Sequence, residues 1–349
     1  MSLRRPLRAV ALGGGHGLYA TLCALRLLTE DVTAVVTVAD DGGSSGRLRR
    51  ELGVLPPGDL RMALAALADC DPDNGPDGQL GHRLVQVFQH RFRGHGALAG
   101  HAVGNLLLAG LLEVLGDPIA ALDEACRLLG VRGRVLPMCT TPLDIEADVT
   151  GLDEDDPAEV WRIRGQVAVA TTPGRVQRVR LLPAEPLACA EAVQAVGAAD
   201  VIVLGPGSWF TSVLPHLLVP DLCRAVVAAR ARRIVVLNLV PQPGETAGFS
   251  PEQHLDVISR HAPELTVDAV LAERDAVTAP DRLAGAVRAL GGWVYLGRLA
   301  AEGVQDRHDP VALAAMVEKV LRDGVTPGGG SRPSTGGRSA GREEQAAWQ

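Results

Sequence analysis

Short apolar runs alternate with helical patterns along most of this chain, and several of the runs end in glycine-rich polar loops. The clearest run, Val32–Ala39, is rich in β-branched residues, which favours a buried strand. Helical patterns surround it at Leu18–Leu28 and Leu60–Leu67, the second with Asp59 as its expected N-cap, and a polar loop is expected over 69–81. An alternation of this kind predicts an α/β fold with a largely parallel sheet.

The same patterns divide the chain into one large α/β domain and a tail. Other expected strands of the main sheet are Leu7–Leu12, Ala199–Leu204, Arg233–Val240, Val267–Leu271 and Trp293–Leu296. Residues 131–182 differ, because short strands at Gly133–Met138, Ile145–Val149, Gln166–Ala170 and Arg175–Leu182 are joined by acidic and Gly/Pro turns. We therefore expect a single domain over 1–322 with a small β-rich insertion at about 131–182. Residues 323–349 are mostly Gly, Ser, Pro and Arg, which predicts a disordered tail.

Composition excludes several classes of function. The net charge of −7 argues against broad binding to nucleic acid or anionic membranes. The only lysine is Lys319, so a phosphate-loop lysine is absent and Schiff-base chemistry is disfavoured. The six scattered cysteines, the lack of a signal peptide and the lack of a membrane span predict a cytoplasmic protein.

The strand Val32–Ala39 ends in Asp40 and Asp41, followed by Gly42-Gly43-Ser44-Ser45-Gly46-Arg47. In open α/β sheets, ligands bind beyond the carboxyl ends of the strands. Two adjacent carboxylates repel each other unless a metal, a sugar hydroxyl or a cation compensates them. Asp, Gly and Ser are also common in ordinary turns, so a plain loop is the alternative interpretation.

A second glycine-rich loop, Gly13–Gly17, follows the first strand and opens a helix. Exposed N–H groups and the helix dipole make such a junction an anion site. The loop lacks the third glycine of a dinucleotide fingerprint, because Leu18 stands there. Within it, His16 either donates a hydrogen bond near a phosphate or packs the loop.

Two further strand ends have the same character, at 205–212 and at 238–246. The glycines and hydroxyls of the first suit a phosphate or diphosphate, although Ser and Thr also cap helices. Asn105, near the start of another helix, points either into the crevice or at the preceding loop. The predicted ligand-binding residues are Gly14, Gly15, His16, Gly17, Asp40, Asp41, Ser44, Ser45, Asn105, Gly205, Gly207, Ser208, Thr211, Ser212, Asn238, Gln242, Glu245, Thr246 and Arg307.

In order, these segments resemble the YvcK/CofD-like family, and most strongly its YvcK branch, whose members are called gluconeogenesis factors or UDP-N-acetylglucosamine-binding proteins. The resemblance is carried by Gly13–Leu18, Val36–Arg47, Pro57–Arg61, Gly104–Leu106, Gly205–Ser208, Thr211-Ser212, Gln242–Thr246 and Arg307–Asp309. It implies a Rossmann-like three-layer sandwich and a regulatory protein that binds UDP-N-acetylglucosamine. The implied role is in cell-wall synthesis, cell shape and growth on gluconeogenic carbon sources. Arg307 is included among the ligand-binding residues because of this resemblance.

The other branch of the family implies an alternative, a Mg²⁺-dependent phospho-group or nucleotidyl transferase similar to 2-phospho-L-lactate transferase, with Asp40 or Asp41 supporting the metal. No catalytic nucleophile is identified, which favours binding without turnover. An NAD-linked oxidoreductase is a third, weaker hypothesis. No cofactor is assigned, and Mg²⁺ is expected only under the transferase alternative. The expected partners are the nucleotide sugar, a cell-wall synthesis enzyme and a Ser/Thr kinase, with a homodimer as an option.

Overall fold

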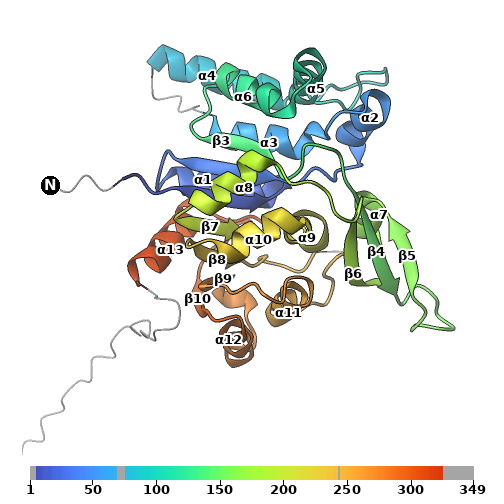
Figure 1. Cartoon of the computed structure of the whole chain (residues 1–349), viewed down its shortest axis with the longest axis vertical. Coiled ribbons are helices and arrows are strands. Elements are labelled where there is room, and N and C mark those ends of the chain that lie inside the picture. The colour runs from blue at the N-terminus through green and yellow to red at the C-terminus, as the bar shows by residue number, and fades with distance from the viewer. Residues whose placement is uncertain (1–4, 69–74, 243, 325–349) are drawn as a thin grey trace, which may run out of the picture.

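The computed structural model describes residues 5–68, 75–242 and 244–324, and its core is a seven-stranded parallel sheet (Figure 1). The strand order is β10-β9-β8-β7-β1-β2-β3. These strands are β1 (Ala9–Gly13), β2 (Val32–Val36), β3 (Arg134–Pro137), β7 (Val201–Leu204), β8 (Arg232–Val236), β9 (Ala269–Glu273) and β10 (Trp293–Gly297). The predicted α/β class and mostly parallel sheet are confirmed.

All the strands run in parallel, but the order in which the chain adds them to the sheet reverses between β1 and β7. From β1 the strands step outward to β2 and β3, whereas from β7 they step the other way to β8, β9 and β10. β1 pairs in parallel with both β2 and β7. This is the topological switch point at which ligands bind in doubly wound sheets.

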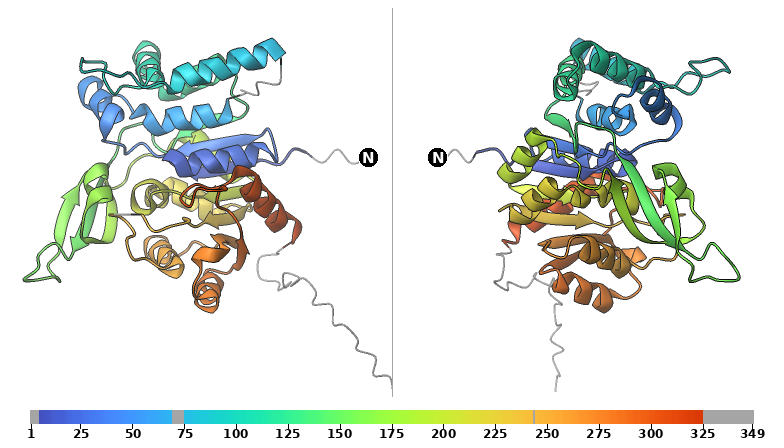
Figure 2. Two further views of the ribbon diagram at one scale, coloured as in Figure 1. Left: turned by 180° about the vertical axis from the view of Figure 1, so that it is seen from behind. Right: turned by 45° about the vertical axis from the view of Figure 1, so that its right-hand side comes forward.

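Helices cover both faces of the sheet, which gives three layers. α8 (Ala190–Ala198) and α10 (Pro220–Ala228) lie on one face, and α1 (Gly15–Arg26) and α13 (Pro310–Arg322) lie on the opposite face (Figures 1 and 2). The remaining helices are α2 (Gly43–Leu52), α3 (Pro57–Leu67), α4 (Gly75–Gln89), α5 (Val103–Leu115), α6 (Pro118–Leu128), α7 (Gln166–Thr171), α9 (Pro215–Leu218), α11 (Pro251–His261) and α12 (Pro280–Ala289), with a π-helical turn η1 (Trp209–Val213) and a 3-10 turn η2 (Arg274–Ala276).

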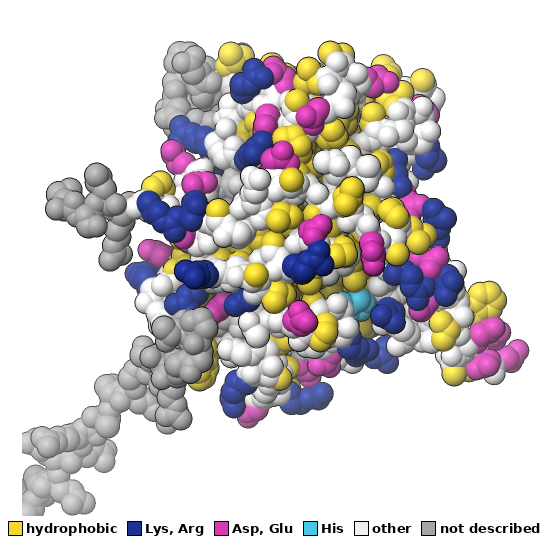
Figure 3. Space-filling model, in the orientation of Figure 1, with side chains coloured by type: hydrophobic (Ala, Val, Ile, Leu, Met, Phe, Trp, Pro, Cys, Tyr) yellow, Lys and Arg dark blue, Asp and Glu magenta, His cyan; other side chains and the backbone are white. Residues whose placement is uncertain are grey.

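A separate antiparallel sheet of three strands stands at the side where the parallel strands end (Figure 1). Its strands, in the order β5-β4-β6, are β4 (Asp144–Thr150), β5 (Trp161–Arg164) and β6 (Arg175–Leu182). The β4–β5 hairpin projects from the body, and acidic side chains gather at its tip (Figure 3). This sheet is the predicted β-rich insertion.

Four local expectations are corrected. The segment 133–138, assigned to the insertion, forms β3 and pairs with β2 in the main sheet. The segment 166–170, expected as a strand, is the helix α7, and β5 was not anticipated. A cap position was expected for Asp59, but α3 begins at Pro57, so Asp59 lies inside its first turn. The helix α4 begins at Gly75, within a region expected to be a loop; residues 69–74 of that region lie outside the described residues.

Most of the predicted tail, residues 325–349, also lies outside the described residues. Across the part of the chain that is described, no helix is both long enough and apolar enough to traverse a lipid bilayer.

Candidate functional site

Three adjoining hollows follow the carboxyl edge of the main sheet. We call them the large hollow (about 590 Å³), the central hollow (about 210 Å³) and the charged hollow (about 250 Å³). Ser208 lines both the large and the central hollow, and Asp40 and Asp59 line both the central and the charged hollow. The three therefore form one continuous depression across the switch point between β1 and β7.

The large hollow is built by five segments: the start of α1, the helix α7, the loop after β7, the segment after β8 and the segment before α13. Its lining residues are His16, Gly17, Ala20, Ala170, Pro206, Gly207, Ser208, Asn238, Leu239, Val240, Pro241, Gln242, Glu245, Val304, Asp306, Arg307 and His308. Burial lowers the pKa of His308 to about 4, so this imidazole is neutral at pH 7. The wall is thus mostly apolar groups, amides and backbone, with Arg307 as an exposed cation.

The loops after β1 and β7 approach each other so closely that a side chain does not fit between them. A Cβ atom on Gly17 would lie 2.1 Å from the carbonyl oxygen of Pro206. On the other side of the loop, the Gly207 N–H donates to Oδ1 of Asn238, and Asn238 Nδ2 donates to the Gly207 carbonyl oxygen, each at 2.9 Å. This pair of bonds fixes the wall of the large hollow from the next strand.

The turn η1 is held by a buried carboxylate. Glu245 accepts hydrogen bonds from the Phe210 N–H at 3.0 Å and from the Thr211 hydroxyl at 2.5 Å. Burial raises the pKa of Glu245, and these bonds act in the opposite direction. Glu245 therefore positions Thr211 and Ser212, which line the central hollow.

The central hollow collects short polar groups. It is lined by Gly15, Thr37, Asp40, Asp59, Gln166, Ser208, Thr211 and Ser212. The hydroxyl oxygen of Thr37 is buried and has no hydrogen-bond partner among the described residues. A buried hydroxyl without a partner is costly, so this atom is a natural contact for a bound polar group.

The charged hollow places two carboxyl groups beside two guanidinium groups. Asp40 and Asp59 line it together with Arg61 and Arg91, and with Ser44, Ser45 and Asn105. Burial, followed by the charge of Asp40, raises the pKa of Asp59 to about 7. Burial also raises the pKa of Asp40, whose oxygens accept hydrogen bonds from the Gly42 N–H at 2.9 Å and from Ser45.

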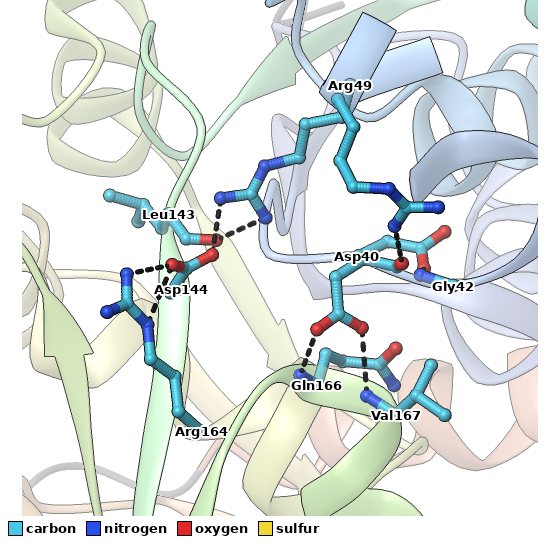
Figure 4. Close-up of polar contacts among 10 residues, drawn as sticks. Asp40, Gly42, Arg49, Leu143, Asp144, Arg164, Gln166 and Val167 are labelled. Carbon is cyan, nitrogen blue, oxygen red and sulfur yellow. Dashed lines mark hydrogen bonds and ion pairs between the residues drawn. The ribbon is translucent and has the colours of Figure 1, made fainter. Parts of the chain in front are cut away.

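Asp41 faces away from all three hollows. Its carboxylate accepts the backbone N–H groups of Gln166 and Val167, each at 3.0 Å, and so caps the start of α7. Beside it, Arg49 and Arg164 both reach Asp144, each at 2.5 Å (Figure 4). These contacts hold the loop after β2 against α7 and the three-stranded sheet, and the role of Asp41 in them is structural.

Most of the predicted site residues line the hollows. Four of them do not, namely Gly14, Asp41, Gly205 and Thr246, which stand behind the lining. Thr246, for example, accepts the Gln242 N–H with its buried hydroxyl. The sequence prediction missed Asp59, Thr37, Arg91 and His308 as lining residues. Thr37, Asp59 and His308 lie inside the segments that carry the family resemblance, but nothing in the sequence pointed to Arg91.

The carboxylates of Asp40 and Asp59, rather than those of Asp40 and Asp41, are the pair that could hold a divalent cation. No group of three or more His, Cys, Asp and Glu side chains suited to a metal occurs among the residues that the structure describes. Mg²⁺ is usually bound through one or two carboxylates together with phosphate and water, so the pair fits a cation brought with a phosphate ligand.

The sequence model of the family described as "2-phospho-L-lactate transferase CofD" matches residues 9–287. A protein of Mycobacterium tuberculosis named "Putative gluconeogenesis factor" is 58% identical over 327 residues, covering 93% of this chain and 92% of that protein. The "Gluconeogenesis factor" of Bacillus subtilis is 38% identical over 272 residues, covering 78% and 79% of the two chains.

A solved structure of a related protein has a similar fold. A crystal structure of a Bacillus halodurans protein, described as a member of the upf0052 family, matches with a TM-score of 0.79 and 35% sequence identity. The match covers 91% of this chain and 99% of that one. Similarity therefore extends over the main sheet and the three-stranded sheet together.

Proposed function

Because this chain belongs to the YvcK/CofD-like family, with relatives named gluconeogenesis factors, we propose that it is a cytoplasmic regulatory protein that binds UDP-N-acetylglucosamine. It holds this nucleotide sugar without converting it. Through the bound state it acts on cell-wall synthesis, cell shape and growth on gluconeogenic carbon sources. A cell-wall synthesis enzyme and a Ser/Thr kinase are the proposed protein partners.

One observation carries the proposal: the large and central hollows join at the switch point between β1 and β7 and differ in chemistry. The central hollow offers hydroxyls and the start of α1, which suit a diphosphate. The large hollow is roomier and offers the Gln242 amide and apolar atoms, which suit a ring with a few polar groups. A nucleotide sugar combines these parts in one molecule.

Isothermal titration calorimetry with UDP-N-acetylglucosamine tests the proposal, with N-acetylglucosamine and ADP-glucose as comparison ligands. We expect saturable heat for the first ligand and much weaker binding of the other two. Arg307→Gln removes the exposed cation of the large hollow, which attracts the negatively charged nucleotide sugar, and should weaken binding about tenfold. Arg288→Gln, an exposed arginine on α12, is the matched control. The absence of heat and of a thermal shift at millimolar ligand would reject the proposal.

A second function, Mg²⁺-dependent transfer of a phospho-group, is favoured by the Asp40–Asp59 pair and by the description of the matching family. Phospho-group transfer depends on positioning and on charge neutralisation, which this pair and Arg61 could provide. Incubation with nucleotide donors and Mg²⁺, followed by mass spectrometry, distinguishes the two functions. A product that requires Mg²⁺ and disappears in Asp40→Asn would replace the binding proposal with the transferase.

A further inference from the structure

We propose that the charged hollow is a second binding site, which holds the phosphate or carboxylate group of a small metabolite between the guanidinium groups of Arg61 and Arg91. The inference goes beyond the proposed function, since it concerns a ligand other than the nucleotide sugar. It would stand even if that sugar did not bind.

Arg61 is a buried cation without a carboxylate partner. Its residue is 7% exposed, and no ion pair of Arg61 within 4.0 Å occurs among the described residues. Burial, followed by the charge of Arg91, lowers the pKa of Arg61 to about 10, and the attraction of Asp59 offsets this only in part. A buried charge is costly unless an opposite charge meets it, so this guanidinium is suited to an anion from outside.

A chain of hydrogen bonds fixes the orientation of this guanidinium. Arg61 Nε donates to Asn105 Oδ1 at 2.8 Å, and Asn105 Nδ2 donates to the Ser44 hydroxyl at 2.9 Å. The Ser44 oxygen lies 2.9 Å from Nδ1 of His101. Burial, together with the charge of Arg47, lowers the pKa of His101, which favours the neutral ring, and the tautomer of that ring sets which of the two groups donates.

This chain uses one edge of Arg61 and leaves its two terminal nitrogens without a hydrogen-bond partner among the described residues. Both nitrogens belong to a side chain that lines the charged hollow. A guanidinium presents paired donors that match the two oxygens of a carboxylate or phosphate. The ligand would therefore meet a donor pair that is already oriented.

Arg91 brings a second positive charge to the same hollow. Its guanidinium donates to the Gly100 carbonyl oxygen at 2.6 Å, which ties it to the loop before α5. Two guanidinium groups on one small hollow repel each other, and an anion between them would remove that repulsion. No carboxylate lies within 4.0 Å of Arg91 in the described part of the chain.

The acidic side of the hollow does not exclude an anion. Asp59 already accepts a hydrogen bond from the backbone N–H of Gly15. Asp40 already accepts bonds from Gly42 and Ser45. The volume of about 250 Å³ suits a small metabolite rather than a nucleotide.

The charged hollow and the large hollow share no lining residue, and only the central hollow connects them. Both sites can therefore be filled at once. The second ligand would lie beside the central hollow, where Asp40 and Asp59 are common to both linings.

Titration calorimetry on the full chain tests the site, with inorganic phosphate and acetate as separate probes at constant ionic strength. We expect saturable binding of at least one probe; which of them binds more tightly tells a phosphate ligand from a carboxylate ligand. Arg91→Gln should weaken binding about tenfold. Arg91 is exposed, so the variant should keep its fold, which circular dichroism checks. The exposed Arg93→Gln is the matched control and should bind like the original protein.

Repeating the titration with saturating UDP-N-acetylglucosamine locates the anion. Binding that persists supports a separate site, whereas complete displacement would mean that the anion occupies the central hollow, and would overturn the proposal. So would the absence of saturable binding for both probes, or an equal loss in Arg93→Gln. If the nucleotide sugar itself gives no heat, the proposed function fails, and the comparison of Arg91→Gln with Arg93→Gln still decides the anion site.

Discussion

The large hollow and the charged hollow lie on the same sheet edge but are built in different ways. The walls of the large hollow come from loops that touch backbone to backbone, as at Gly17 and Pro206, and its only exposed cation is Arg307 among the described lining residues. The walls of the charged hollow come from side chains that are joined by hydrogen bonds and that carry four ionisable groups. The first depends on shape and the second on charge.

This difference indicates how each region responds to change. A region that depends on close backbone approach should lose its form when an atom is added, whereas a region that depends on charge should respond to pH and to single charge substitutions. The following four predictions test that contrast, beginning with the largest effect.

Gly17→Val should disrupt the shape-dependent region most strongly. The new Cβ would lie 2.1 Å from the Pro206 carbonyl oxygen, so the loops after β1 and β7 must separate. We expect a loss of about 3 kcal/mol or more in the free energy of unfolding and no detectable binding of UDP-N-acetylglucosamine. Denaturant unfolding and calorimetry measure both. Gly110→Ala, on α5 with open space around it, should be neutral or slightly stabilising; an equal loss there would argue against the contact at Pro206.

Asp59→Asn tests the charge-dependent region. The pKa of Asp59 is raised from 3.8 to about 7, so the folded state binds the proton more tightly than the unfolded state. Its contribution to stability is therefore fully present below pH 3.8 and is lost as pH rises through about 7. In buffer free of divalent cations, the variant should be more stable than the original protein at pH 8, by about 1–3 kcal/mol, and the difference should shrink towards pH 5.

Thermal and denaturant unfolding across this pH range provide the measurement. Asp156→Asn, at the exposed end of the β4–β5 hairpin, serves as the control and should show no such pH dependence. A pH-independent difference between Asp59→Asn and the original protein would mean that the carboxyl group is ionised throughout.

Asn238→Ala should have an intermediate effect on the large hollow. It removes both hydrogen bonds to Gly207, which should cost about 1–2 kcal/mol of stability and weaken nucleotide-sugar binding about tenfold. Anion binding in the charged hollow should be unchanged, since no residue is shared. Calorimetry with each ligand makes the comparison, and Gln194→Ala on the exposed side of α8 is the control. Equal losses for both ligands would show that the two regions are not independent.

Thr37→Val should give the smallest effect on folding. The hydroxyl oxygen of Thr37 is buried without a partner in the described structure, so its removal should leave stability unchanged or raise it by less than about 1 kcal/mol. Binding should nevertheless weaken if a ligand group meets this oxygen in the central hollow. Stability and affinity measured on the same sample give the answer, and a stable variant with full affinity would remove Thr37 from the site.

The sequence predicted most strands of the main sheet, with the exception of β3, because they are short β-branched or apolar runs that are largely buried. β2 and β7 are examples, with ends within a few residues of the expected ones. The prediction of a strand at 166–170, where the structure has the helix α7, was wrong for a physical reason. The valines of this segment alternate with alanines in a short apolar run, which is typical of a strand, but its first N–H groups are capped by Asp41, 125 residues earlier in the chain. A contact so distant leaves no trace in a local pattern.

The loops that form the candidate site could be predicted from the sequence, but which side chains meet one another in that site could not. Asp40 and Asp41 are neighbours, and the sequence does not tell which carboxylate faces the ligand side. In the structure Asp40 faces the hollows, Asp41 faces α7, and the second acidic group comes from Asp59 on α3. Asp59 was expected at a helix cap because Pro57 and Gly58 precede it, and only the packing of α3 against the strand ends reveals its place.

The bond between Asp41 and the start of α7 has a mechanical consequence. The carboxylate that caps α7, directly after β5, and the carboxylate that lines two hollows are consecutive in the chain. A displacement of the projecting hairpin, as by a docked protein, would therefore be passed through Asp41 and one peptide bond to Asp40, in the lining of the central and charged hollows.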